Sequence, residues 1–125
     1  MSPETTTALG RRAEGRALAY LESQGLALIA RNHRCRGGEI DLVMREGAVL
    51  VLVEVRSRSR RDYGGAAASI GARKQRRFIV AARHLLRTRP ELARLRARFD
   101  VVAIDAGTAP GTTTIEWIRD AFRLS

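Results

Sequence analysis

Apolar residues recur at helical spacing in two parts of the chain. In residues 8–24 they predict an amphipathic helix, and Gly25 is suited to end it. Residues 73–89 predict a second helix, which Pro90 ends because proline lacks a backbone N–H. Its expected inward-facing residues are Phe78, Ile79, Ala82, Leu85 and Leu86. Residues 91–97 are expected to add a short helical turn.

Shorter apolar runs predict strands. Residues 26–34 form one run, and residues 37–56 are typical of a β-hairpin with two apolar strands. Two further strands are expected at residues 99–104 and 115–118. Residues 57–72 contain Gly64-Gly65 and few apolar anchors, so we expect a long loop there.

The predicted order is α-β-β-β-α-β with an additional C-terminal strand. A helix between the hairpin and the fourth strand lets that strand join by a crossover, which gives a mixed sheet flanked by helices. The fold class is therefore α/β. Because a chain of 125 residues has room for one core, we expect a single domain over residues 8–125. We expect residues 1–7 to form a disordered N-terminal tail.

The hairpin carries acidic side chains within its apolar run. If Glu46 and Gly47 are the two turn residues, Asp41 faces Leu52 and lies diagonal to Glu54. One face of the hairpin is then wholly apolar, made of Ile40, Leu42, Met44, Val49, Val51, Val53 and Val55. The other face ends in a charged group, Glu39, Asp41, Glu54 and Arg56.

Two carboxylates roughly 5–8 Å apart repel each other unless a positive group lies between them. A divalent cation is one solution, because Mg²⁺ takes oxygen ligands and keeps several waters. An ion-pair cluster is the other, with Arg56 or a more distant arginine neutralising the acids. Glu14 borders the apolar stripe of the first predicted helix, where an exposed helix glutamate is one interpretation.

The net charge of +10 is concentrated in one block. Residues 55–98 contain 14 arginine or lysine residues against only Asp62 and Glu91. This block predicts a positive surface that faces a polyanion such as nucleic acid. A solubilising surface is the alternative, and the presence of a single lysine, Lys74, indicates a compositional preference for arginine. That preference does not explain the missing acidic partners.

The chain lacks the features of a secreted or membrane protein. Cys35 is the single cysteine, so no internal disulfide is expected. The opening residues MSPETTT are polar, and no apolar run approaches the roughly 20 residues that span a bilayer. We therefore expect a cytoplasmic protein with no membrane partner.

The hairpin motif resembles that of a known superfamily. GEID followed by EVR resembles the PD-(D/E)XK nuclease motif of the restriction-endonuclease-like superfamily, and the element order resembles its core. More closely, the chain resembles the YraN family of small bacterial proteins. The matching pieces, in order over residues 10–122, are Gly10 with Glu14, RNHRCRGGEIDLV, VLVEVRSR, YGGAAASI followed by Lys74, RFDVV and DAF.

The resemblance implies a restriction-endonuclease-like core, similar to archaeal Holliday-junction resolvases, with Mg²⁺ or Mn²⁺ as its cofactor. Asp41 and Glu54 match the metal-binding acids. The carbonyl of Val55 matches a further ligand position, and Glu14 matches a first-helix glutamate that approaches the metal. By analogy with the resolvases, a homodimer is expected.

Arg56 departs from the superfamily pattern, which has lysine at that position. A lysine there can orient or deprotonate the attacking water, whereas arginine stays protonated and can only orient groups or stabilise charge. Lys74 is expected to substitute in part, so the expected catalytic residues are Asp41, Glu54, Arg56 and Lys74. Neighbouring phosphates are expected to be held by Arg58, Arg60, Arg61, Arg73, Arg76 and Arg77.

Two functions follow as expectations. The first is a metal-dependent endonuclease that acts on branched or structured DNA rather than RNA. The alternative is a non-catalytic nucleic-acid-binding protein that retains the nuclease fold. Asp100 is interpreted as a structural partner for an arginine. His33, at the end of a strand, is interpreted as a structural residue or a phosphate contact, and His84 is expected on the surface of the second helix.

Overall fold

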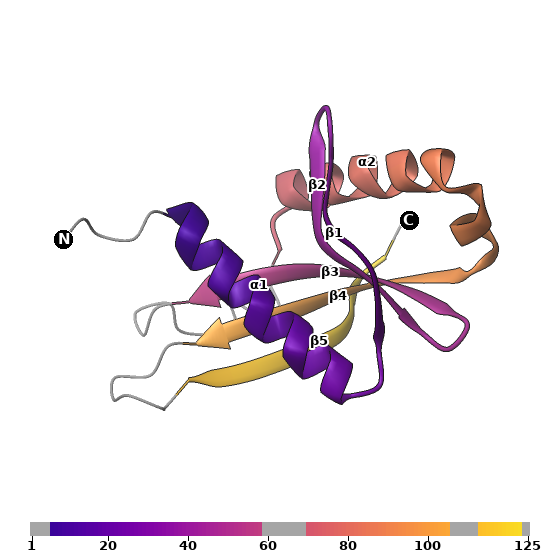
Figure 1. The fold of residues 1–125 in the computed structure, drawn as a ribbon. Helices are drawn as coiled ribbons and strands as arrows, with labels where there is room; N and C mark the ends of the chain where they lie inside the picture. The colour runs from indigo at the N-terminus through magenta and orange to yellow at the C-terminus, as the bar shows by residue number, and fades with distance from the viewer. Residues whose placement is uncertain (1–5, 59–69, 106–112, 124–125) are drawn as a thin grey trace.

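The computed structural model describes residues 6–58, 70–105 and 113–123. This part of the chain forms two α-helices, a short 3-10 helix and five strands (Figure 1). In chain order they are α1 Thr6–Ser23, β1 Ala27–Cys35, β2 Gly38–Glu46, β3 Val49–Arg58, α2 Ala72–Thr88, η1 Pro90–Arg94, β4 Arg96–Asp105 and β5 Thr114–Phe122. In the described residues, neither helix has the length and apolar character needed to cross a membrane.

The sheet is mixed, as the element order predicted. Its strands follow the order β1-β2-β3-β4-β5. Only β3 and β4 are parallel, and α2 lies in the crossover between them, while the other neighbouring strands are antiparallel. The predicted α/β fold class is therefore confirmed, and the architecture is consistent with a restriction-endonuclease-like core.

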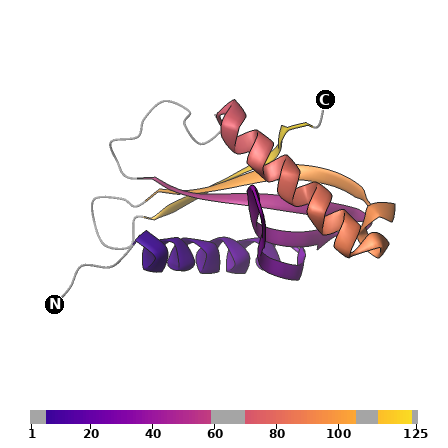
Figure 2. The same cartoon turned by 90° about the horizontal axis from the view of Figure 1, so that it is seen from above.

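The two helices cover opposite faces of the sheet (Figure 2). On one face, Ala17 and Leu21 of α1 pack against Val51 and Val53 of β3. On the other face, α2 packs against residues that alternate with them along the strands, Leu50 and Leu52 among them. Because β3 is buried on both sides, it is the apolar centre of a three-layer fold.

The turn between β2 and β3 lies one residue further along than predicted. Leu42 pairs with Val53 and Glu46 pairs with Val49, so Gly47 and Ala48 are the turn residues. Gly47 adopts a φ of 60°, which a glycine tolerates and which would strain Glu46 at the first turn position. The predicted partner of Asp41 was therefore wrong, although the alternation of faces was preserved.

The first residues of β2 leave the flat sheet. The paired register of β2 with β3 ends at Leu42 and Val53, while β2 remains paired with β1 as far as Gly38. Ile40 was predicted to share a face with Leu42, but it lies in the α2 core. The physical reason is that the β1–β2 ribbon twists out of the sheet and crosses α2 (Figure 1).

Element bounds differ from the sequence expectations in several places. β5 continues to Phe122, beyond the expected end at residue 118. In α2, Ala81 is buried and Ile79 only half-buried. The predicted loop over residues 57–72 begins later, because Ser57 and Arg58 extend β3, and Ile70 is buried in the α2 core. The remainder of that loop, residues 59–69, lies outside the described residues.

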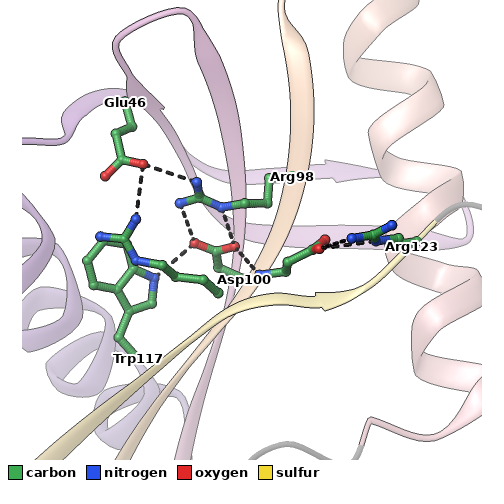
Figure 3. Close-up of polar contacts among 7 residues, drawn as sticks. Glu46, Arg98, Asp100, Trp117 and Arg123 are labelled. Atoms are coloured by element: carbon green, nitrogen blue, oxygen red, sulfur yellow. Dashed lines mark hydrogen bonds and ion pairs between the residues drawn. The ribbon is translucent and has the colours of Figure 1, made fainter.

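A polar network joins β4, β5 and the β2–β3 turn (Figure 3). Asp100 is fully buried and accepts hydrogen bonds from Arg98 Nε and Nη2, from Trp117 Nε1 and from the Asp120 backbone N–H, each at 2.9 Å. Arg98 Nη1 reaches Glu46 Oε1 at 3.0 Å. The expected role of Asp100 as an arginine partner is confirmed.

Candidate functional site

A cleft of about 670 Å³ opens where three elements meet at one end of the sheet. The N-terminal half of α1 contributes Glu14, the β2–β3 pair contributes its acidic residues, and the first turns of α2 contribute basic ones. The lining of the cleft includes Glu14, Glu39, Asp41, Glu54, Val55, Arg73, Lys74 and Arg77.

The separation of β2 from β3 creates the centre of this cleft. Asp41 directly precedes the last paired residue of β2, and Glu54 directly follows its partner on β3. The Val55 N–H, which no longer has a strand partner there, donates a hydrogen bond to Asp41 Oδ2 at 2.8 Å. Because the N–H and C=O of one strand residue point to the same side, the Val55 carbonyl faces the same opening.

The Asp41 carboxyl is electrostatically unfavourable as an anion. Burial is the largest cause, followed by the negative charge of Glu54, and together they raise the pKa of Asp41 to about 8. Glu14 and Glu39 raise that pKa further, while the Val55 N–H lowers it. Asp41 therefore holds its proton near neutral pH unless a cation enters the cleft.

Glu14 faces the same acidic group from α1. The residue is buried, and its Oε1 accepts no hydrogen bond from the described residues, although Arg31 lies 3.9 Å away. Burial raises the pKa of Glu14, and a hydrogen bond from Asn32 and the charge of Arg31 oppose that rise. The interpretation of Glu14 as an exposed helix glutamate is thus wrong.

Lys74 provides a positive charge in direct contact with the acidic residues of the cleft. Its ammonium forms an ion pair with Glu54 Oε1. The two side chains differ in exposure, with 53% of the Lys74 side chain and 7% of the Glu54 side chain accessible. The flexible partner is therefore the lysine, which can leave Glu54 without a change in the sheet.

The structure brings together most, but not all, of the residues proposed from the sequence. Arg73 and Arg77 line the cleft beside Lys74. Arg56 is half-buried beside Ala103 of β4, and Arg76 is exposed on α2; neither is among the cleft-lining residues that the structure describes. The predicted Arg60 and Arg61 lie outside the described residues, as does the side chain of Arg58.

Some polar contacts were missed by the sequence analysis. Glu39 lines the cleft and forms an ion pair with Arg34 at 3.6 Å. His33 Nε2 lies 3.0 Å from His84 Nδ1, a contact that the sequence analysis did not predict. Pairing between residues 51 positions apart leaves no signal in the sequence, because it depends on how the ribbon crosses α2.

The family comparison agrees with the extent of this fold. The family described as "Uncharacterised protein family UPF0102" matches residues 13–104, which include most of α1 and all strands except β5. The chain belongs to the UPF0102 family. The resemblance to YraN-like proteins is therefore confirmed at the level of the family.

Relatives in several bacteria match nearly the full length of this UPF0102 chain. A UPF0102 protein of Dechloromonas aromatica is 52% identical over 119 residues, which cover 95% of this chain and 92% of the relative. One from Cupriavidus metallidurans is 53% identical over 96% of this chain and 84% of its own length. One from Saccharophagus degradans is 49% identical, covering 93% of both chains.

The cleft of this family member has an oxygen-only donor set that fits a small divalent cation. Asp41 and Glu54 provide two carboxylates, and the Val55 carbonyl faces the same opening. Glu14 lines the cleft but does not complete a site of three carboxylates with them. No cluster of three or more His, Cys, Asp or Glu side chains with metal-binding geometry occurs in the described part of the chain. Mg²⁺ fits this set because it needs only one or two carboxylates and retains waters.

Proposed function

We propose that this protein is a metal-dependent, nuclease-like enzyme that hydrolyses phosphodiester bonds in branched or structured DNA. The observation that carries the proposal is that Asp41 and Glu54 flank the Leu42–Val53 pair at which β2 leaves β3. Arg73, Lys74 and Arg77 of α2 line the same cleft. Such hydrolysis requires carboxylate side chains that hold a cation and positively charged side chains that hold the phosphate.

Asp41 and Glu54 would hold Mg²⁺ or Mn²⁺ with the Val55 carbonyl as a further oxygen donor, and Glu14 would lie beside this site in the cleft. When bound, the cation activates water and stabilises negative charge on the leaving oxygen. The Val55 N–H fixes the Asp41 carboxylate through its 2.8 Å hydrogen bond, which orients this ligand in advance. Asp41 would release its proton on metal binding, because the positive charge of the cation stabilises the ionised carboxylate.

The basic residues of α2 would bind the phosphate. Arg73 and Arg77 line the cleft one helical turn apart and offer planar guanidinium groups that suit phosphate oxygens. Lys74 would exchange its contact with Glu54 for one with the scissile phosphate. Arg56 is not among the cleft-lining residues that the structure describes, so we assign the charge-stabilising role to Lys74 rather than to Arg56.

A second function is favoured by the ion pair between Lys74 and Glu54. If the ammonium keeps its place, it neutralises the acidic pair without a metal, and the protein binds nucleic acid without cleaving it. The arginine at position 56, in place of the lysine of the superfamily pattern, favours the same function.

Calorimetric titration with Mn²⁺ separates the two functions at the level of the metal. We expect wild-type protein to bind Mn²⁺, Asp41→Asn and Glu54→Gln to lose binding, and Lys74→Gln to bind more tightly because the competing ammonium is gone. Glu116→Gln, an exposed β5 residue outside the cleft, is the matched control and should bind as wild type does. Absence of Mn²⁺ binding to the wild-type protein would exclude the metal-dependent enzyme.

Cleavage is then measured on four-way junctions, flaps and linear duplexes in Mg²⁺ or Mn²⁺. Loss of a metal-holding carboxylate in Asp41→Asn or Glu54→Gln should lower the rate by about 100-fold or more, while Glu116→Gln keeps the wild-type rate. Mn²⁺ binding and DNA binding without cleavage would instead support the non-catalytic protein. Cleavage that survives both carboxylate substitutions would contradict the assigned site.

A further inference from the structure

One side of α2 carries a row of exposed arginines. Positions 73, 76, 77, 80, 83 and 87 share this side of the helix, because 76 and 77 both lie about one turn from 73 and from 80, and 83 and 87 continue the row at spacings of three and four. All are exposed, and all are arginine except Val80, which is 40% accessible. We call the five arginines, Arg73, Arg76, Arg77, Arg83 and Arg87, the α2 stripe.

The α2 stripe lacks neutralising acids in the described part of the chain. Helix α2 contains no aspartate or glutamate, and Lys74 is its only side chain in an ion pair among the described residues. Exposed arginines on a helix are commonly balanced by acids one turn away, which stabilise the helix. Because α2 has no such acids, its arginines repel one another, and an external polyanion would reduce this repulsion.

The stripe is continuous with the cleft at one end and is crossed by the β1–β2 ribbon near its middle. Arg73 and Arg77 belong to both the stripe and the cleft wall. A β-carbon on Gly37, in the turn between β1 and β2, would lie 3.7 Å from Val80 Cγ1, so the ribbon tip sits over the middle of α2. The exposed Arg36 directly precedes Gly37 in this tip, which therefore adds a positive charge beside the stripe.

We infer that the α2 stripe and Arg36 bind the phosphate backbone of a DNA duplex that leads into the cleft. At a rise of about 1.5 Å per residue, the stripe from Arg73 to Arg87 is roughly 21 Å long. A duplex rises about 3.4 Å per base pair, so the stripe matches roughly six base pairs. The inference rests on the proposed function in taking DNA as the ligand of the adjoining cleft, and it adds the direction in which the DNA runs.

A duplex fits this surface better than a single strand or a membrane. Helix α2 presents no fully exposed aromatic side chain on which single-stranded bases would stack, because Phe78 is buried and the half-buried His84 ring packs against His33. The apolar face of α2 is packed against the sheet, so the helix cannot insert it into a lipid surface. A rigid line of charges at fixed spacing suits the regular phosphates of a duplex.

The test measures the salt dependence of binding to fluorescent duplexes of about 6, 12 and 24 base pairs, by anisotropy in EDTA so that no metal site contributes. The test variant is Arg83→Gln with Arg87→Gln, at the end of the stripe away from the cleft. The matched control is Arg16→Gln with Arg45→Gln, which removes the same charge from exposed positions on α1 and next to the β2–β3 turn. Circular dichroism verifies that each variant folds.

We expect the slope of log K against log salt to become shallower by about 2 in Arg83→Gln/Arg87→Gln, or roughly 0.9 for each lost phosphate contact, and to be unchanged in the control. Arg36→Gln should reduce it by about 1. The wild-type gain in affinity between the shortest and the middle duplex should shrink in the double variant. The measurement is made in EDTA and follows binding alone, so these results hold even if cleavage is never observed.

Three outcomes would overturn the inference. One is a wild-type slope in Arg83→Gln/Arg87→Gln, even if the cleft cleaves DNA. Another is that Arg83→Gln/Arg87→Gln loses as much affinity for single strands as for duplexes of the same length, which would show that the stripe does not prefer a duplex. The third is tighter binding to phosphatidylglycerol vesicles than to duplexes, lost in the same variant, which would make the stripe a lipid-binding surface.

Discussion

Asp41 has a fixed hydrogen-bond partner but lies among other negative charges. Its carboxyl accepts a hydrogen bond from the Val55 N–H at 2.8 Å, yet it is half-buried. Desolvation and the negative charges of Glu54, Glu14 and Glu39 raise its pKa. Its raised pKa and its position in a cleft together favour a functional role over a structural one.

The raised pKa of Asp41 predicts a specific dependence of stability on pH. The folded protein holds the Asp41 proton up to about pH 8, whereas the unfolded chain releases it near the ordinary value of 3.8. Between these values the folded state binds more protons, so the free energy of unfolding falls as pH rises, and this loss is complete above pH 8. Asp41→Asn removes the titrating group and keeps an acceptor for the Val55 N–H.

We therefore expect Asp41→Asn to be more stable than wild type at pH 8 in EDTA, by on the order of 1 kcal/mol or more, with the difference shrinking toward pH 4. Urea unfolding across this range measures the effect. Glu116→Gln should follow the wild-type curve at every pH. An Asp41→Asn curve parallel to that of wild type would show that Asp41 is ionised in the folded protein and that no buried repulsion exists.

At the scale of elements, the β1–β2 ribbon decides where the cleft opens. The ribbon pairs with β3 only as far as Leu42, then twists toward α2 and packs Ile40 into the α2 core. Close contact at Gly38 holds this arrangement, since a β-carbon there would lie 2.1 Å from the Arg77 carbonyl oxygen and 2.9 Å from the Ala81 nitrogen. The site thus depends on a backbone contact between the ribbon and α2, made beside the cleft-lining residues Glu39 and Arg77.

Gly38→Ala tests this contact. The methyl group meets helix backbone that cannot rotate away, so the ribbon must move off α2, and we expect a loss of about 1–3 kcal/mol in the free energy of unfolding. Gly15→Ala is the control of opposite sign, because its β-carbon meets nothing within 4 Å and lies inside α1. There the exchange should stabilise the protein by about 0.5–1 kcal/mol. Equal unfolding midpoints for both variants would contradict the close contact of β2 with α2.

At the scale of the whole molecule, two apolar layers are joined by one buried polar network. Arg98 links Asp100 on β4 to Glu46 beside the β2–β3 turn, and Trp117 and Asp120 tie β5 to the same carboxylate. Trp117 also meets Tyr20 of α1 edge to face, with ring centroids 6.2 Å apart. The network therefore connects elements from both ends of the chain.

Asp100→Ala should be strongly destabilising. It leaves Arg98, the Trp117 N–H and the Asp120 N–H without their acceptor in a buried site, and loss of one partner of a buried ion pair costs about 3–5 kcal/mol. Arg123→Ala removes only an exposed partner of Asp120 and should change stability little. Guanidinium unfolding of the two variants gives the comparison. A loss for Asp100→Ala no larger than that for Arg123→Ala would show that the network does not bear on folding.

The sequence alone determined the elements, the fold class and the acidic pair. Hydrophobic periodicity follows from local burial, so both helices, the hairpin and the crossover to β4 were predictable, as was the grouping of Asp41 with Glu54 on one face. Helix periodicity also placed Arg73 and Arg77 on the exposed side of α2.

Only the tertiary structure decided how those parts meet. The register of the β2–β3 turn depends on where a positive φ is tolerated, and the departure of Ile40 from its predicted face depends on the twist of a ribbon across a helix. The burial of Glu14, the pairing of Lys74 with Glu54 and the absence of Arg56 from the cleft wall all involve residues far apart in sequence. Such contacts are set by the packing of whole layers, which no local pattern encodes.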